Sequence, residues 1–537
     1  MKTTHILNAF CGLALLATAT SCNDWLLEES PGKTGLDDFF TSGNTAIQVV
    51  NACYTPLAWE FNSTYFSEWF IGDIVSDDAL KGGQNLTDMA DVYDLENFKT
   101  NANNTMLLDF YRAQYQGIAR CNLAIQEVAK VDADTTMTES RKNCLLGEAH
   151  FMRAYYYFRL VRVFGGVPYV DFVIDSSSKW QQPRASEATI YENIVKDLEI
   201  AEPLLWNKSE YADEDLGRAT KGAAQAMLLK TYLYMGGHLD PAYFEKAYEW
   251  GKKFITEQYE TGEYSLNPNY ADNFTLAGEN GPESVFEIQY MAEPTSDYGE
   301  GYGFTRGTFT TILTRCRATA LGAGWGFNHP TQNLYDEFEA GDPRRDATII
   351  NPTDDQLDNP EQEIYLGSRY YNRKYAYNED GVYVTLDHAT RSPVNYRLIR
   401  ASDVLLMYAE AALESGKDIA AAKWALEEVR KRARGGNDAI LPAFPNYNGY
   451  SDNTEDLRKA IRHERRVELA MEGHRWFDLC RWGIAYEVMD KDNGSYGKNE
   501  TPEARAEMAS FVKGKNELFP IPSQEINLNP MEQNPGY

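Results

Sequence analysis

The chain has 537 residues, which is enough for a large hydrophobic core and for two subdomains in one body. Its formal net charge is −29, and such an excess of carboxylates repels phosphate backbones, so the composition argues against a nucleic-acid partner. Aromatic residues make up 13% of the chain, with 35 Tyr and 10 Trp, and most of them are expected to fill helix interfaces.

The first 22 residues have the pattern of a secretory targeting segment. Lys2 provides a positive charge, Ile6–Ala19 is an apolar run shorter than the roughly 20 residues that span a bilayer, and small residues precede Cys22. The pattern predicts a lipoprotein signal peptide at residues 1–21 and a lipid anchor on Cys22. The usual lipoprotein motif has Leu three places before the Cys, where this chain has Ala19, so a plain secretory signal is the alternative.

Cysteine and histidine usage indicates neither a disulfide framework nor a metal centre. Five cysteines follow Cys22, an odd number at wide spacing, and the chain contains no CxxC pair. The seven His form no cluster of ligands. We therefore expect no cofactor and no metal.

Residues 22–45 are polar and turn-rich, and we interpret them as a tether leading into a helical region at residues 46–260. Apolar residues at helical spacing then predict a series of helices, the fourth of them capped by Ser186. These predicted helices are Thr45–Trp59, Met106–Val131, Leu145–Phe164 and Ser186–Leu205.

Two later stretches have the form of helical hairpins, Gly222–Ile255 and Ala401–Arg434. Each contains two amphipathic helices joined by a short turn, and each is roughly 34 residues long, the period of a tetratricopeptide repeat. In the second hairpin, alanines lie between large apolar residues and allow the two helices to approach closely. Because one hairpin cannot bury its own apolar face, we expect the pairs to stack on one another.

Between these hairpins the helical periodicity fades. Residues 264–394 are rich in Gly, Asn, Pro, Tyr and Asp, with short strand-like pieces at Ser284–Tyr290 and Gly381–Leu386. A long irregular region between rigid helices is more often functional than idle. We predict a mainly α fold, a tetratricopeptide-like helical body with a large loop-rich insertion, and a second domain at residues 261–537. That domain ends with helices at 396–482, of which Leu457–Trp482 is the last, and a tail at 483–537.

Several sequence blocks resemble one known family. In chain order they are SDDA at Ser76–Ala79, FGGVPYV at Phe164–Val170, GRATKGAAQAMLLKTYLYMG at Gly217–Gly236, GDPRRDATI at Gly341–Ile349, YRLIRASDVLLMYAEA at Tyr396–Ala411, ERRVELAMEGHRWFDLCRWG at Glu464–Gly483 and the QNPGY ending. With the lipoprotein start, these blocks make the whole mature chain similar to the RagB/SusD family of nutrient-uptake lipoproteins.

The resemblance implies a surface lipoprotein of the outer membrane, with a tetratricopeptide body. Members of this family sit as a lid on a TonB-dependent transporter and capture oligosaccharides. The family's helical repeats support the body and face the transporter, and its ligand site lies in irregular loops. The resemblance indicates only which regions of this chain carry the ligand site, because the matching blocks do not identify single ligand-contact residues.

The loop Tyr290–Trp325 is our first candidate for the ligand site. It carries aromatic and basic side chains on a glycine-rich backbone, at Tyr298, Tyr302, Phe304, Arg306 and Trp325. An aromatic plane can pack on the apolar face of a sugar ring while polar groups bind its hydroxyls. Trp325 could equally be a buried residue packed in the hydrophobic core. Tyr93 and Phe98, in the polar loop before Met106, are weaker candidates.

Asp73, Asp77 and Asp78 form a second candidate site in a loop after a helix. Carboxylates accept hydrogen bonds from sugar hydroxyls and can bind calcium. Glycosidase chemistry needs two carboxyl groups roughly 5–9 Å apart across a substrate, and the sequence identifies no distant partner. The alternative is a capping or turn role.

The densest charge cluster is His463–Trp482. It begins like a zinc-binding HExxH motif, but Val467 stands where the second His belongs. Glu464, Glu468 and Glu472 fall on one stripe of a helix, and we predict a buried ion-pair network with nearby arginines.

The sequence as a whole predicts a non-catalytic, lipid-anchored glycan-binding protein. A glycoside hydrolase using the loop carboxylates and a tetratricopeptide scaffold without a ligand are the alternatives. The sugar, its linkage, the partner transporter and the choice between a glycan and a peptide ligand stay open.

Overall fold

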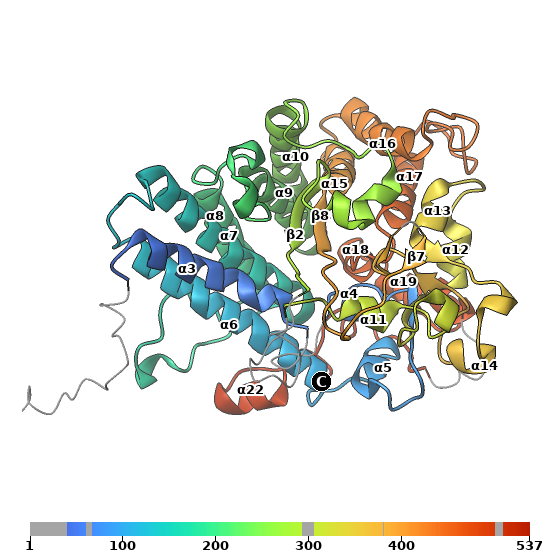
Figure 1. Cartoon of the computed structure of the whole chain (residues 1–537), viewed down its shortest axis with the longest axis horizontal. Helices are drawn as coiled ribbons and strands as arrows, with labels where there is room; N and C mark the ends of the chain where they lie inside the picture. Colours follow the sequence, from blue (N-terminus) through green and yellow to red (C-terminus); the bar gives the residue numbers. More distant parts are fainter. Residues whose placement is uncertain (1–39, 61–66, 293–305, 380, 500–507) are drawn as a thin grey trace, which may run out of the picture.

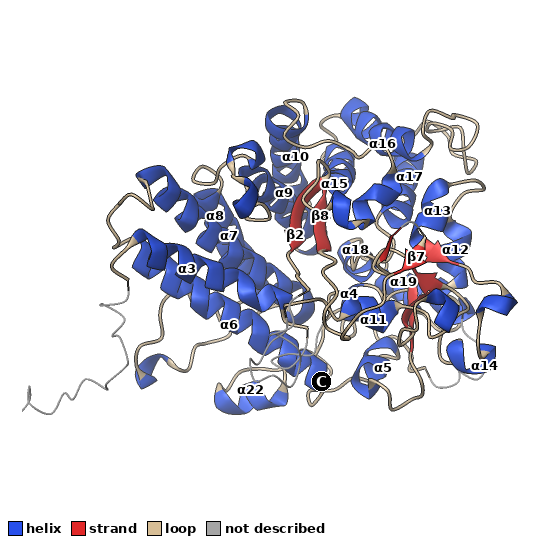
Figure 2. Cartoon of the chain, viewed as in Figure 1, coloured by secondary structure: helices blue, strands red, loops and turns tan. Residues whose placement is uncertain are grey.

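The computed structural model describes residues 40–60, 67–292, 306–379, 381–499 and 508–537. Helices dominate this part of the chain, and its strands are short (Figure 2). The predicted mainly α fold is therefore confirmed. Among the residues that the structure describes, no helix is both long enough and apolar enough to cross a lipid bilayer.

The body of the molecule is a stack of helices in which each packs on the next (Figure 1). α10 packs directly on α15, although the insertion 255–400 separates them in sequence. The predicted hairpins are therefore neighbours in one array. Its members are α3 (Gly43–Tyr54), α6 (Thr105–Val128), α7 (Glu139–Phe164), α8 (Glu187–Ala201), α9 (Lys221–His238), α10 (Tyr243–Phe254), α15 (Ala401–Glu414), α16 (Ile419–Ala433) and α17 (Thr454–Glu468).

Local signals explain where these helices begin and how closely they pack. The Ser186 hydroxyl accepts a hydrogen bond from the Thr189 N–H, as predicted for a cap of α8. Glycine permits the closest helix contacts, because a Cβ on Gly251 of α10 would lie 2.7 Å from the ring of Tyr408 on α15.

One predicted helix has wrong bounds, and one helix was not predicted. The expected helix Leu457–Trp482 is two helices, α17 and α18 (Arg475–Arg481), because the chain reverses through positive φ angles at Met471 (63°) and Gly473 (78°). The polar loop before Met106 contains a short helix that was not predicted, α5 (Ala90–Glu96), whose apolar residues Val92 and Leu95 are buried.

Within the described ranges, the strands form four separate antiparallel pairs. The central pair, β2 (Ser284–Ile288) with β8 (Tyr396–Arg400), lies beside α9 and α15 near the middle of the view (Figure 2). β2 confirms the predicted strand at Ser284–Tyr290, whereas β8 replaces the expected start of a helical segment at residue 396. The other pairs are β1 (Ala79–Gly82) with β3 (Phe327–Pro330), β4 (Ile349–Ile350) with β5 (Tyr371–Asn372), and β6 (Asn378–Glu379) with β7 (Val382–Tyr383).

The insertion and the tail contain short helices, and one more, α4 (Trp69–Gly72), precedes β1. Those in the insertion and the tail are α11 (Thr310–Thr314), α12 (Gln332–Glu337), α13 (Pro343–Thr348), α14 (Pro360–Glu363), α19 (Ala485–Met489), α20 (Ser495–Asn499) and α22 (Ser523–Leu528). The tail returns to the first half of the chain: the Phe519 N–H donates to the Val163 carbonyl at 2.8 Å, and Glu525 pairs with Arg112 at 2.7 Å. The domain boundary near residue 260 stays a prediction.

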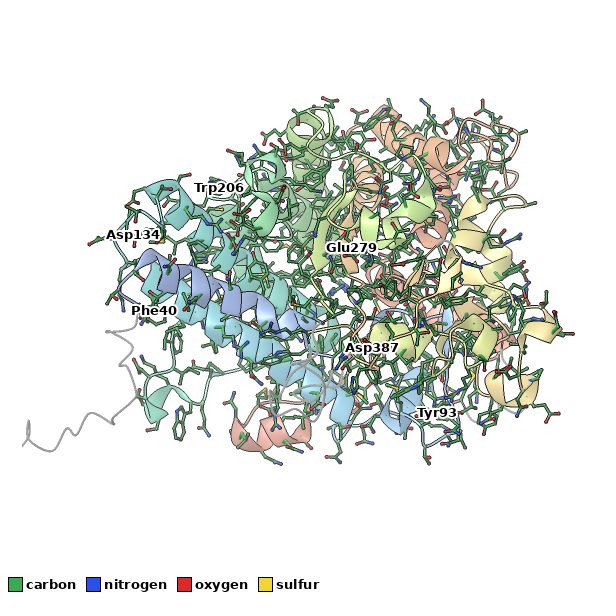
Figure 3. The ribbon with its side chains drawn as sticks, viewed as in Figure 1. Phe40, Tyr93, Asp134, Trp206, Glu279 and Asp387 are labelled. Carbon is green, nitrogen blue, oxygen red and sulfur yellow. The ribbon has the colours of Figure 1, made fainter. Side chains whose placement is uncertain are left out.

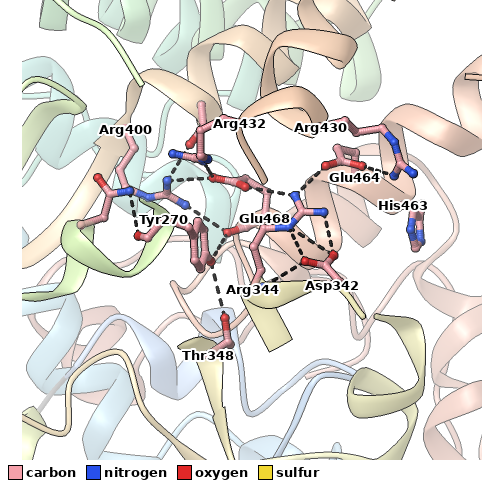
Figure 4. A network of polar contacts seen from close by, with 12 residues as sticks. Tyr270, Asp342, Arg344, Thr348, Arg400, Arg430, Arg432, His463, Glu464 and Glu468 are labelled. Atoms are coloured by element: carbon pink, nitrogen blue, oxygen red, sulfur yellow. Dashed lines mark hydrogen bonds and ion pairs between the residues drawn. The ribbon is translucent and has the colours of Figure 1, made fainter. Parts of the chain in front are cut away.

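A buried ion-pair network ties the C-terminal elements together, as predicted from the charge cluster (Figure 4). Arg344 contacts Glu464 at 2.5 Å and Glu468 at 3.1 Å, and all three side chains are fully buried. Arg400 of β8 joins Glu468 to Glu283 beside β2, with distances of 2.9 and 2.6 Å. Each charge is paired, which buried charges require.

Candidate functional site

An open groove with a volume of about 690 Å³ lies within the irregular insertion. One side is the segment that runs from α11 to Trp325, and the other is the β6–β7 hairpin with the residues that follow it. Most lining side chains are apolar or carry a hydroxyl. The lining residues are Ile312, Arg315, Thr319, Ala320, Gly322, Ala323, Trp325, Gly381, Val382, Tyr383, Val384, Thr385, Leu386 and Ala389.

Trp325 presents an accessible aromatic ring to this groove. The residue is 38% exposed, and its backbone N–H donates to the Ile312 carbonyl at 2.8 Å. Phe309 supports the indole from behind in an edge-to-face contact, with ring centroids 5.0 Å apart and planes at 86°. The ring is therefore held in place without being covered.

Glycine is required in the tight turn before Trp325. Gly322 has φ = +99°, and a Cβ there would lie 3.0 Å from Arg315 Cδ and 3.2 Å from Tyr383 Cγ. A Cβ on Gly324 would lie 2.2 Å from Arg315 Cβ. These glycines let the backbone close around Arg315 at the base of the groove.

Arg315 fastens the opposite wall. Its guanidinium donates to the backbone carbonyls of Ala376, Tyr377 and Val384, which flank the β6–β7 hairpin. Only 2% of the residue is exposed, and burial lowers the pKa of its guanidinium to about 10. The side chain remains charged at neutral pH and uses one N–H of each of its three nitrogens to bind the carbonyls around the hairpin.

Glu60 orders the backbone next to Phe309. Its carboxylate accepts hydrogen bonds from the Thr308 and Thr310 hydroxyls, both at 2.7 Å, and from the Phe309 N–H at 2.6 Å. Burial raises the pKa of this carboxyl, and these bonds oppose the rise. Glu60 thus holds the start of α11 and, through Phe309, supports Trp325.

This combination suits a ligand with both an apolar face and hydroxyl groups. The Trp325 indole offers a flat surface for an apolar face, and the Val382 side chain, 70% exposed, extends that apolar surface across the groove. Hydroxyls on Thr319, Tyr383 and Thr385 lie along the same lining and can donate or accept hydrogen bonds.

Among the predicted ligand residues that the structure describes, only Trp325 is part of the groove lining. Arg306 is exposed just before the Thr308–Ser392 bridge, and its carbonyl accepts from the Met291 N–H at 3.0 Å. Tyr93 lies on α5, half-buried, with Lys81 Nζ 5.7 Å from its ring centroid (Figure 3). Cys22, Tyr298, Tyr302 and Phe304 lie outside the described residues.

The expectation that Asp73, Asp77 and Asp78 bind a ligand is wrong. Each is only 1% exposed. Asp77 pairs with Arg475 at 2.7 Å and Asp78 pairs with Arg466 at 2.8 Å.

The hydrogen bonds of these carboxylates confirm an internal role. Asp73 accepts from the Gly473 N–H at 2.8 Å, and burial raises its pKa to about 7. Burial opposes ionisation of Asp77 as well, but Arg466 and Arg475 hold its pKa below the usual range. All three carboxylates therefore join the loop at residues 73–78 to the C-terminal segment that contains Arg466, Gly473 and Arg475. This role is structural, and it is closer to the alternative given for these residues than to ligand binding.

Phe98 is also an interior residue, at 7% exposure, packed against Trp476 and Phe511. Sequence reasoning in turn missed Glu60, Arg315 and Tyr383. Arg315 lies in TILTRCRATAL, a stretch that gives no local sign of its contacts with carbonyls more than sixty residues away. The glycines around Trp325 were the available signal, and they do mark the groove.

Comparisons with known proteins agree along nearly the whole chain. A model of the SusD family matches residues 282–537, and a model described as starch-binding and associating with the outer membrane matches residues 26–233. SusD-like protein P2 of Formosa agariphila is 28% identical over 552 residues, which cover 98% of each chain.

Two solved structures have the same fold. A laminarin-binding SusD-like protein is 28% identical with a TM-score of 0.74, over 93% of this chain and 100% of that chain. The surface glycan-binding protein A from Bacteroides fluxus is 26% identical with a TM-score of 0.75, again over 93% and 100% of the two chains.

Proposed function

Because the chain belongs to the RagB/SusD family, we propose that it binds a glycan at the cell surface and delivers it to a TonB-dependent transporter in the outer membrane. The observation that carries the proposal is the exposed Trp325 ring, held by Phe309 at the edge of an open groove. A pyranose ring has an apolar face that stacks on such an indole and hydroxyls that hydrogen-bond at its rim.

The names of the relatives support a carbohydrate ligand. Two structures with the same fold, at 28% and 26% identity, are described as laminarin-binding and surface glycan-binding. Binding should be modest at a single site, since stacking in an open groove competes with water.

We propose that lipid on Cys22 anchors the protein to the outer membrane. The support is the targeting pattern before Cys22 and the description of one matching family model, which associates with the outer membrane. Transfer to a TonB-dependent transporter follows from family membership. In this scheme the helical array faces the transporter.

The protein is proposed to be non-catalytic. The loop carboxylates that a hydrolase would need, Asp77 and Asp78, are buried against Arg466 and Arg475, which argues against their use on a substrate. Purified protein incubated with oligosaccharides should release no product. Turnover that persists through further purification and is lost in Asp77→Asn would overturn this part of the proposal.

Trp325→Ala tests the glycan site. We expect it to lower the affinity for the bound polysaccharide by about tenfold, which a native gel containing that polysaccharide shows as weaker retardation of the protein. Stacking of a flat ligand ring on an aromatic side chain contributes on the order of 1–3 kcal/mol. Trp180→Ala is the matched control, because Trp180 is 71% exposed and lies outside the groove lining. It should leave retardation unchanged.

Equal retardation of the Trp325 variant and the parent protein would reject this site. If no glycan in a broad array binds, the scaffold alternative gains. Tyr302→Ala tests the adjoining loop in the same gel, and Tyr298, Phe304, Arg306 and Tyr93 stay predicted ligand contacts until such variants are measured.

A further inference from the structure

The groove beside Trp325 contains very little charge. Arg315 is the sole residue with a charged side chain among the described residues that line it. The remaining lining is made of small residues, aliphatic side chains, one indole and the hydroxyls of Thr319, Tyr383 and Thr385. A ligand in this groove therefore meets apolar surface and neutral hydrogen-bonding groups.

The single cation is not available to an anion. Recognition of a carboxylate or sulfate by arginine uses paired N–H groups on one edge of the guanidinium. In Arg315 the Nε, Nη1 and Nη2 atoms each donate to a backbone carbonyl, and 2% of the residue is exposed. Turning it toward a ligand would release the β6–β7 hairpin.

Acidic groups flank the groove instead. The Asp358 carboxylate accepts from both the N–H and the hydroxyl of Thr319, at 2.7 and 2.8 Å, which places a negative charge beside this lining residue. Asp387 directly follows Leu386 on the other side (Figure 3). Its side chain is 87% exposed, and its carboxylate lies 3.9 Å from Arg391 Nη1. The net charge of −29 adds a long-range field of the same sign.

We propose that this groove selects uncharged oligosaccharides and discriminates against glycans that carry carboxylate or sulfate groups. The inference rests on the proposed function, because it concerns the same site. Its physical basis is charge. An anionic sugar would lose water without gaining a cation from the described residues that line the groove, and it would approach Asp358 and Asp387, of which only Asp387 is paired among the described residues, with Arg391 at the groove's edge. One such unfavourable contact is enough for about a tenfold loss of affinity.

The test compares neutral polysaccharides with carboxymethylated derivatives of the same backbones. We would use laminarin, starch and galactomannan, each paired with its derivative, and the chain from residue 23 onward, which keeps every core residue described. Native affinity gels identify which of these glycans bind, and titration calorimetry measures their affinities. At least one neutral glycan should bind, its derivative should bind at least about tenfold more weakly, and Trp325→Ala should abolish the difference by removing the binding.

The possible failures are distinguishable. Tight binding of the charged derivative that still depends on Trp325 would overturn the selectivity while leaving the glycan site in place. Binding that does not depend on Trp325 would overturn the proposed site itself.

Repeating the titration at about 0.5 M salt screens the net charge. Discrimination that vanishes under that condition would overturn its assignment to the groove, and discrimination that persists would support it.

Discussion

At the scale of single residues, His463 shows how packing decides chemistry. Its Nδ1 lies 2.7 Å from Glu337 and its Nε2 lies 3.3 Å from Glu339. Arg430 and Arg466 bind the same two carboxylates. Burial disfavours the charged imidazole, but the hydrogen bonds to the two glutamates outweigh it and raise the pKa to about 9. Both ring nitrogens are donors at neutral pH, so this His is part of the ion network.

His463→Gln should remove a pH-dependent part of the stability. A histidine whose pKa is raised on folding contributes fully below its ordinary value of 6.5, and that contribution is lost as pH rises toward about 9. Between pH 6.5 and 9 the free energy of unfolding of the parent should therefore fall by up to about 3 kcal/mol more than that of the variant. Urea denaturation at a series of pH values measures this difference.

His388→Gln is the control for this experiment, since its ring bonds the Thr390 hydroxyl and not the two glutamates. It should follow the parent's pH dependence. A His463 variant with the same slope as the parent would contradict the assignment.

At the scale of elements, the β6–β7 hairpin depends on a side chain that is distant in sequence. Its four strand residues are Asn378–Glu379 and Val382–Tyr383, and such a short pair is not stable by itself. Arg315 supplies the missing support through carbonyls on both sides of the hairpin. Because the hairpin is one wall of the groove, the position of that wall depends on Arg315.

Arg315→Lys should loosen this wall while the helical array stays folded. The lysine keeps a positive charge but cannot reproduce three donors in one plane, and each lost bond costs about 0.5–1.5 kcal/mol. Hydrogen exchange should accelerate in peptides covering 376–386 and stay unchanged in α15, and the glycan affinity should fall by about tenfold. Faster exchange with unchanged affinity would show that the hairpin takes no part in binding.

At the scale of the whole molecule, the described residues form a body that carries its groove in the insertion between α10 and α15. A stack of helices, each packed on its neighbour, gives the loops a rigid support. The structure does not describe residues 1–39, so the proposed attachment to the membrane rests on the sequence and is tested by changing Cys22.

Cys22→Ser should release the protein from membranes. The thiol is the group that would take the lipid, and a hydroxyl cannot replace it in that reaction. Cell fractionation should find the variant in the soluble fraction, and labelling with a fatty-acid analogue should be lost. Cys480→Ser, at a half-buried position within the body, is the control and should stay with the membrane. Membrane association of the Cys22 variant equal to that of the parent would contradict the lipid anchor.

Local patterns in the sequence were enough to predict the helices. Apolar spacing, the Ser186 cap and the charge stripe of Glu464, Glu468 and Glu472 depend on contacts within one or two turns, and the structure has helices and an ion network where they were predicted. The boundary error at Gly473 has a tertiary cause. Its backbone reverses to meet Gly72 and to donate to Asp73, 400 residues earlier.

The site required tertiary structure. Whether an aromatic ring faces solvent or the core depends on segments far away in sequence. Trp325 and the weaker candidate Phe98 were both predicted from loop sequences, yet one lines the groove and the other packs on Trp476. Glu60 reaches Thr310 across 250 positions, and Asp77 reaches Arg475 across 398. The sequence by itself determined the helical class and the region of the groove, because both follow from local spacing. Which side chains are open to a ligand was decided by long-range packing, since burial and charge pairing arise only when distant segments meet.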